Sequence, residues 1–300
     1  MRLIILGASG LIGGQLYRDA MADSRKVIGT YGRNARDGMR PFDITKDSLN
    51  DKLGQIGPED IVFLMAARID MNWVKDNPEE SRAINIDGAK RIIDKVNAAG
   101  AIILYISSEA IFDGVDGGYV ETSLPHPLTL YGRQKLEIEN YIKDASKDWC
   151  IVRTGWTVGR DNFGHNPISA TYHTLKRPGA KMAKDNIFTI TDVRDTSRAI
   201  LKLMNQNKRG LYHVASNPPV CRTELADWIM DSSKHRALMN YETVQFKDLT
   251  FSEPRPAKSW ISNKKLVKEI DQSFIPPRQI AEEIVAQIEA DIEEPERTSI

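Results

Sequence analysis

The chain has 300 residues, which is long enough for one large α/β unit or two closely packed domains. Its 41% hydrophobic and 27% charged residues are typical of a globular protein with a sizeable core, and they exclude a disordered or collagen-like chain. The 41 basic residues balance 41 acidic ones, so we expect no nucleic-acid partner and no attraction to an anionic membrane.

The two cysteines, Cys150 and Cys221, are far apart and belong to no Cys/His cluster, so we expect neither a disulfide nor a metal site. The apolar run at Leu3 to Leu6 is too short for a signal peptide. No run approaches the roughly 18 apolar residues that span a bilayer. We therefore expect a cytoplasmic protein with reduced thiols.

Apolar strands alternate with amphipathic helices through the first half of the chain. The predicted strands are Leu3 to Leu6, Val27 to Thr30, Ile61 to Ala66, Ala101 to Ile106 and Trp149 to Val152. The predicted helices are Gly10 to Ala20, Lys46 to Leu53, Glu79 to Ala99 and Tyr131 to Asp144. Strands that are apolar throughout and separated by helices indicate a parallel sheet covered on both faces. We predict an α/β fold with a doubly wound parallel sheet, a Rossmann domain, at residues 1–155.

After residue 155 the alternation of strands and helices is replaced by shorter elements. Helical spacing persists at Asp192 to Met204, Thr223 to Met230 and Pro277 to Ile292. The polar tail at 293–297 is expected to fray. We predict that residues 156–300 form mainly a smaller C-terminal α/β lobe that binds substrate, with some segments returning to the Rossmann core.

A G-x-x-G-x-x-G spacing lies between the first strand and the first helix. Glycines allow a tight turn and a close approach of the backbone to a pyrophosphate, and the helix N-terminus offers free N–H groups to the anion. The alternative is a glycine-rich turn without a ligand. The residues predicted to bind a nicotinamide cofactor here are Gly7, Ser9, Gly10, Leu11, Ile12 and Gly13.

The residues after the second strand bear on the choice of cofactor. That strand ends at Thr30 without the acidic residue that commonly binds the ribose of NAD, and Arg33 follows. A guanidinium can bind a 2′-phosphate, so NADP(H) is favoured over NAD(H), although Arg33 could also lie in a solvated loop. Asp43 and Ile44 are candidates to reach the adenine, and a helix N-cap is an equally good interpretation of Asp43.

Tyr131 and Lys135 are four residues apart at the start of a predicted helix and therefore share one face. An ammonium close to a phenol lowers the phenol pKa toward neutrality, which suits acid–base catalysis. Ser108 ends the fourth predicted strand, where a doubly wound fold builds its site, and could polarise a substrate carbonyl. An ordinary helical pair and a strand-end cap are the structural alternatives.

Motifs along nearly the whole chain resemble one family. They are the turn at 7–13, Ala66-Ala67, Asn77-Pro78-Glu79, Ser107 to Gly114, Tyr131 with Lys135, Arg153 to Gly159, and Arg255-Pro256-Ala257-Lys258-Ser259. The chain resembles the extended short-chain dehydrogenases/reductases, and within them the dTDP-4-dehydrorhamnose reductase group. The late Arg-Pro motif and Phe112-Asp113-Gly114 resemble the reductase group in particular.

The resemblance implies reduction of a nucleotide-linked 4-keto-6-deoxy sugar by hydride from NADPH. Tyr131 would supply the proton, Ser108 would orient the carbonyl, and Lys135 would tune Tyr131 and hold the cofactor ribose. It also places Ala66 and Ala67 at the cofactor. The residues that it implies for substrate binding are Ser107, Glu109, Arg153, Trp156 and Arg255. Arg255 would contact the diphosphate or the nucleotide, and the alternative is that this arginine between two prolines only fixes a loop.

Other functions remain as alternatives. Ala110 stands where the family usually has an aromatic residue, and it also removes the carboxylate pair that a nucleotide-sugar 4,6-dehydratase needs. An epimerase would more often end the second strand with an acidic residue. The regulatory β subunit of methionine adenosyltransferase resembles the same reductase group and acts as a partner protein. A homodimer is one option for the assembly.

Overall fold

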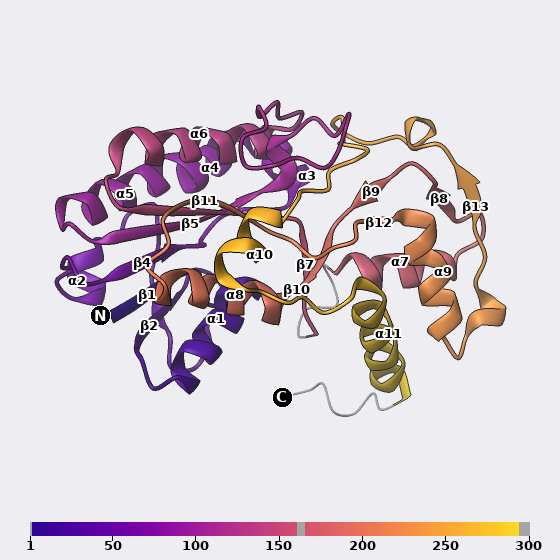
Figure 1. Cartoon of the computed structure of the whole chain (residues 1–300), viewed down its shortest axis with the longest axis horizontal. Helices are drawn as coiled ribbons and strands as arrows, with labels where there is room; N and C mark the ends of the chain where they lie inside the picture. The colour runs from indigo at the N-terminus through magenta and orange to yellow at the C-terminus, as the bar shows by residue number, and fades with distance from the viewer. Residues whose placement is uncertain (1, 161–165, 294–300) are drawn as a thin grey trace.

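A computed structural model describes residues 2–160 and 166–293, so most of the predicted tail at 293–297 lies outside the described residues. Seven parallel strands form the main sheet in the order β11-β6-β5-β4-β1-β2-β3 (Figure 1). They are β1 Arg2–Leu6, β2 Lys26–Tyr31, β3 Arg40–Pro41, β4 Ile61–Leu64, β5 Ile102–Ser108, β6 Trp149–Thr154 and β11 Gly210–Val214. The predicted parallel α/β sheet is confirmed, and its edge strand β11 comes from the second half of the chain.

Helices cover both faces of this sheet (Figure 1). On one face lie α1 Leu11–Ala22, α8 Val193–Asn205 and α10 Lys264–Ile270, whose apolar side chains pack on the strands. On the other lie α2 Leu49–Leu53, α5 Ala89–Ala98 and α6 Leu130–Ala145. Successive strand residues point to opposite faces, so strands that are apolar throughout supply both cores.

The helix predicted at 79–99 is divided into three parts. It consists of α4 Pro78–Arg82, a π-helical segment Ala83–Gly88 and α5. A π turn contains an extra residue and so rotates the following side chains around the helix axis. Here it brings the buried Asn85 to the loop after β4, where its side chain bonds the backbone of Arg68.

The helix predicted at 46–53 begins later, at Leu49. The preceding residues form a turn around Asp43, whose carboxylate accepts hydrogen bonds from the backbone N–H and the hydroxyl of Thr45 at 2.9 and 2.6 Å. Local hydrogen bonds of this kind compete with helix formation.

The second half adds three small sheets and their helices. The strand pairs are β7 Trp156–Val158 with β10 Ile190–Asp192, β9 Ile187–Phe188 with β12 Val220–Cys221, and β8 Lys181–Ala183 with β13 Glu242–Val244. The helices are α7 Pro167–Leu175, α9 Arg222–Ser232 and α11 Pro277–Glu293, which share one apolar cluster. The predicted helices at 192–204, 223–230 and 277–292 are confirmed, whereas α3 Met71–Asp76 and β11 were not predicted.

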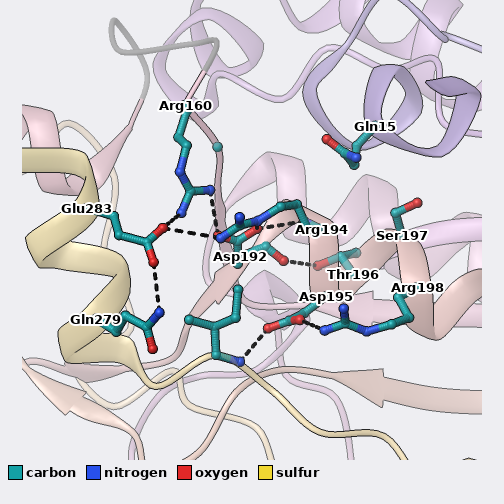
Figure 2. A network of polar contacts seen from close by, with 12 residues as sticks. Gln15, Arg160, Asp192, Arg194, Asp195, Thr196, Ser197, Arg198, Gln279 and Glu283 are labelled. Carbon is teal, nitrogen blue, oxygen red and sulfur yellow. Dashed lines mark hydrogen bonds and ion pairs between the residues drawn. The ribbon is translucent and has the colours of Figure 1, made fainter. Parts of the chain in front are cut away.

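A polar network joins α11 to the start of α8 (Figure 2). Asp192 caps α8 by accepting from the backbone N–H of Arg194 at 2.8 Å, and its carboxylate also pairs with Arg160 and Arg194 at 2.9 Å. Both arginines reach Glu283 of α11. These ion pairs hold the end of the chain against the Rossmann core. Within residues 2–160 and 166–293, no helix has the length and apolar character to cross a bilayer.

Candidate active site

The glycine turn between β1 and α1 is tightly packed at two of its three glycines. Gly7 has φ of +90°, and a Cβ there would lie 2.8 Å from the backbone nitrogen of Ala66. A Cβ on Gly13 would overlap the carbonyl oxygen of Gly7. Gly10 is exposed, and a Cβ there would meet only the Gly7 oxygen, at 3.4 Å. Packing of β1, α1 and the loop after β4 therefore explains two glycines, whereas packing does not explain the exposed Gly10.

The start of α1 fits an anionic ligand. In the described chain, the first turn of α1 carries no acidic side chain, so the positive end of its dipole is not neutralised there. Ser9, Leu11 and Ile12 are half-buried beside this turn. The turn and helix end together fit the pyrophosphate of a dinucleotide.

The residues after β2 lie at one side of the turn. Thr30 is buried and its hydroxyl accepts from the backbone N–H of Gly7 at 3.2 Å. Arg33 is exposed and pairs with Glu80 at 3.0 Å. The hydrogen bonds from Thr45 lower the pKa of Asp43, as expected for a local turn residue. Ile44 is buried in the core. Cofactor binding by Arg33, Asp43 and Ile44 stays a prediction.

Ser108, Tyr131 and Lys135 come together at the carboxyl edge of the sheet. Ser108 is the last residue of β5, and Tyr131 and Lys135 lie in the first two turns of α6. Thr129 starts this helix by accepting from the backbone N–H of Gly132 at 3.1 Å. Ser108 interacts with the Tyr131 phenol, and the Lys135 Nζ lies 5.7 Å from the centre of the Tyr131 ring.

The pKa values of Tyr131 and Lys135 differ from the expectation based on the sequence. Burial raises the pKa of Tyr131, and the Ser108 hydrogen bond only partly opposes this effect. Burial lowers the pKa of Lys135 to about 8. The expected lowering of the Tyr131 pKa by Lys135 is wrong, because burial dominates and the Lys135 ammonium donates to the Ile106 carbonyl at 2.9 Å. Tyr131 is thus a protonated phenol at neutral pH, the state that can donate a proton.

Glu109 faces the same site, whereas Ser107 points elsewhere. Glu109 is buried and accepts from the Ser259 hydroxyl at 3.2 Å, and burial raises its pKa well above the usual range. A Cβ on Gly155 would lie 2.6 Å from its Oε2, so Glu109 reaches the segment before Trp156. Ser107 is buried beside the Glu139 carboxylate. Their proposed contacts with substrate stay predictions.

The remaining predicted residues are dispersed. Arg153 is buried and paired with Glu139, so its observed contacts are structural. Trp156 stacks on Phe188 with ring centres 4.7 Å apart. Arg255 donates to the Asn72 side chain at 2.8 Å, which ties the second half of the chain to α3. Substrate binding by Arg153, Trp156 and Arg255 stays a prediction.

Two arginines near the site were not singled out from the sequence. Arg68 follows the Ala66-Ala67 pair at the end of the third predicted strand. Its position after that strand is the feature of the sequence that could have identified it as a candidate site residue. Arg222 lies 4.7 Å from the Trp156 ring centre, and burial lowers its pKa to about 10. The sequence has no comparable signal for Arg222, because β12 and the start of α9 come to Trp156 only through folding.

Known proteins match most of the length of this chain. The family described as "RmlD substrate binding domain" matches residues 1–290. The chain is 24% identical over 279 residues to methionine adenosyltransferase 2 subunit beta of Xenopus laevis, covering 89% of this chain and 82% of the relative. It is 26% identical over 278 residues to dTDP-4-dehydrorhamnose reductase of Aggregatibacter actinomycetemcomitans, covering 88% and 92%.

The fold has a solved counterpart. The crystal structure of dTDP-4-dehydrorhamnose reductase from Bacillus anthracis in complex with NADP superimposes with a TM-score of 0.77. Sequence identity is 24%, and the match covers 96% of this chain and 99% of that one. This likeness establishes that the two chains share a fold.

Proposed function

The chain belongs to the RmlD substrate binding domain family, and on that premise we propose that it is an NADP(H)-dependent reductase of a nucleotide-linked 4-keto-6-deoxy sugar. The observation that carries the proposal is the convergence of Ser108, Tyr131 and Lys135 at one edge of the sheet. The reductase relatives and the NADP complex of the Bacillus anthracis reductase support the choice of reaction and cofactor.

Each side chain has a distinct task in this reaction. Ser108 donates a hydrogen bond to the C4 carbonyl oxygen and orients it toward Tyr131. Tyr131, kept protonated by burial, transfers its proton to that oxygen as the carbonyl becomes an alcohol. Lys135 holds its ammonium between the Ile106 carbonyl and the phenol ring, where it can bind the cofactor ribose and stabilise the phenolate that forms. The reduced nicotinamide, when bound, supplies the hydride.

Cofactor and substrate contacts extend on either side of these three residues. We assign Gly7 to Gly13 to the pyrophosphate, Ala66 and Ala67 to the cofactor on the β4 side, and Arg33 to the 2′-phosphate. Arg33 is exposed and forms a surface ion pair with Glu80, a weak contact that a phosphate can replace at little cost. Glu109, Trp156 and Arg255 are assigned to the substrate side.

The test is a panel of nucleotide-linked 4-keto-6-deoxyhexoses with different bases, incubated with the full chain and NADPH. We expect NADPH oxidation with at least one sugar, together with the corresponding alcohol as product. The same sugars without the protein are the control. A protein that binds NADPH but oxidises it with no member of the panel would contradict the proposal.

A second function is favoured by the methionine adenosyltransferase β relatives. In that case the chain would bind a methionine adenosyltransferase as a regulatory subunit. Retention of Ser108, Tyr131 and Lys135 in one site favours catalysis. Co-purification of a methionine adenosyltransferase with the tagged chain, without turnover of the panel, would favour the regulatory role.

A further inference from the structure

Arg68 presents a charged group that the protein itself does not satisfy. Its Nη2 atom is buried and has no hydrogen-bond partner. Its guanidinium lies 4.6 Å from the centre of the Trp73 ring, and within the described residues no ion pair joins it to an acidic side chain. Leaving a buried donor of a charged group without a hydrogen-bond partner is energetically costly. A partner supplied by a bound ligand would remove this cost.

The backbone of Arg68 is held rigidly. Its N–H donates to the Asn85 side-chain oxygen at 2.7 Å, and its carbonyl accepts from the Asn85 amide at 2.9 Å. Asn85 donates in turn to Gln134 of α6 at 2.8 Å. These buried amides link the loop after β4 to the helix that carries Tyr131. Arg68 is therefore placed in advance, as a binding residue should be.

The surroundings of the guanidinium point to the substrate side of the site. Trp73 belongs to α3, and α3 packs with Tyr131 and Ala110 in one apolar cluster. Arg255 reaches the same helix from the second half of the chain, with its guanidinium on Asn72. The glycine turn is approached instead by Ala66, two residues earlier. Two arginines thus contact α3, Arg68 at Trp73 and Arg255 at Asn72.

We propose that Arg68 binds the diphosphate of the nucleotide-linked substrate, an inference that rests on the proposed function. A guanidinium fork matches phosphate oxygens in bidentate geometry, and the Trp73 ring, 4.6 Å away, restrains its position. The second arginine at α3 suits a ligand with two charged phosphates. Arg68 is then a specificity residue for diphosphate-linked sugars.

The experiment measures ligand binding apart from turnover. Calorimetric titrations with NADPH and with dTDP, UDP, GDP, CDP and ADP are made on the full chain and on Arg68→Gln, Arg68→Lys and Arg25→Gln. Arg25 is a matched control, because it is half-buried at the amino end of β2 and donates to Asn205 at 2.8 Å. The NADPH titration also reports whether each variant is folded.

We expect Arg68→Gln to weaken binding of the preferred nucleoside diphosphate about 10- to 100-fold, as for loss of a charge-assisted contact. Arg68→Lys should retain part of the affinity, and Arg25→Gln should bind like the wild type. NADPH binding should be unchanged in all of them. In turnover, Arg68→Gln should raise KM with little change in kcat.

Different results would contradict the assignment of Arg68 and the proposed function. Equal nucleoside diphosphate binding by the wild type and Arg68→Gln would overturn the assignment of Arg68 and leave the proposed function standing. Loss of NADPH binding alone in Arg68→Gln would also overturn it. If Arg68→Gln binds neither ligand, it is not folded and Arg68→Lys decides: nucleoside diphosphate binding at the wild-type affinity by that variant would overturn the assignment. A wild-type chain that binds none of the nucleoside diphosphates would contradict the proposed function itself.

Discussion

Glu139 and Arg153 form a buried bidentate ion pair, with Nε–Oε1 and Nη2–Oε2 distances of 2.9 and 2.7 Å. Their side chains are 0% and 1% exposed. Glu139 lies on α6, one turn after Lys135, and Arg153 lies on β6. The pair therefore fastens the helix that carries Tyr131 and Lys135 to the sheet.

Replacing Arg153 by Met should lower the free energy of unfolding by about 3–5 kcal/mol, because it removes the buried partner of the Glu139 carboxylate and leaves the partly exposed Lys143 at 3.3 Å. Urea denaturation measures this change. The double variant Glu139→Leu/Arg153→Met is the control and should recover part of the loss. Unchanged stability together with a raised KM would instead favour the sugar contact that the family resemblance implies for Arg153.

Replacing Tyr131 by Phe should reduce kcat about 100- to 10,000-fold, since it removes the proton donor and keeps the ring. Steady-state NADPH oxidation with the active sugar measures the effect. NADPH affinity should stay near that of the wild type, because the lost hydroxyl faces the substrate carbonyl in this mechanism. Turnover at the wild-type rate would refute the assigned acid.

The pH dependence of kcat/KM should show a descending limb near pH 8. The pKa of Lys135 is lowered to about 8 by burial, so its ammonium is present below that pH and is lost above it. The raised pKa of Tyr131 keeps the phenol protonated through this range. Lys135→Arg, which stays charged, should move the limb to higher pH. A profile that is flat from pH 7 to about 9.5 would contradict the role given to the ammonium.

Replacing Arg33 by Ala should weaken NADPH binding by about 1–3 kcal/mol and NADH binding little, since only NADPH has a 2′-phosphate. Fluorescence titration with both cofactors measures the difference. Glu80→Gln is the matched variant and should strengthen NADPH binding slightly, because it frees Arg33 from its surface pair. Equal losses for the two cofactors would remove Arg33 from the 2′-phosphate site.

Sequence patterns were sufficient to predict the main strands and helices of the sheet domain. Period and composition predicted five strands of the sheet and the helices beside them, because burial on both faces demands continuous apolar runs. They did not predict β11, whose place at the sheet edge depends on pairing with β6. They also missed the π turn around Asn85, since its extra residue is accommodated by contacts with Arg68 and Gln134.

In the candidate site, too, some features follow from the local sequence and others depend on the folded structure. The spacing of Tyr131 and Lys135 places both on one helix face, and the glycine spacing indicates a dinucleotide turn, because both are local properties of the chain. Protonation states are not local. The phenol of Tyr131, the ammonium of Lys135 and the carboxyl of Glu109 are shifted mainly by burial, which depends on segments brought together from the whole chain.

The sequence alone determined the α/β class and predicted the glycine turn and the Tyr131–Lys135 pair as candidate site features, since each follows from residue types at short spacing. Only the tertiary structure decided which charged residues are already paired and which remain free to bind a ligand. Arg153 forms an ion pair with Glu139 of α6, whereas the Nη2 atom of Arg68 is buried without a hydrogen-bond partner. The physical reason is that charge compensation depends on distances between segments remote in sequence, and these exist only once the chain has folded.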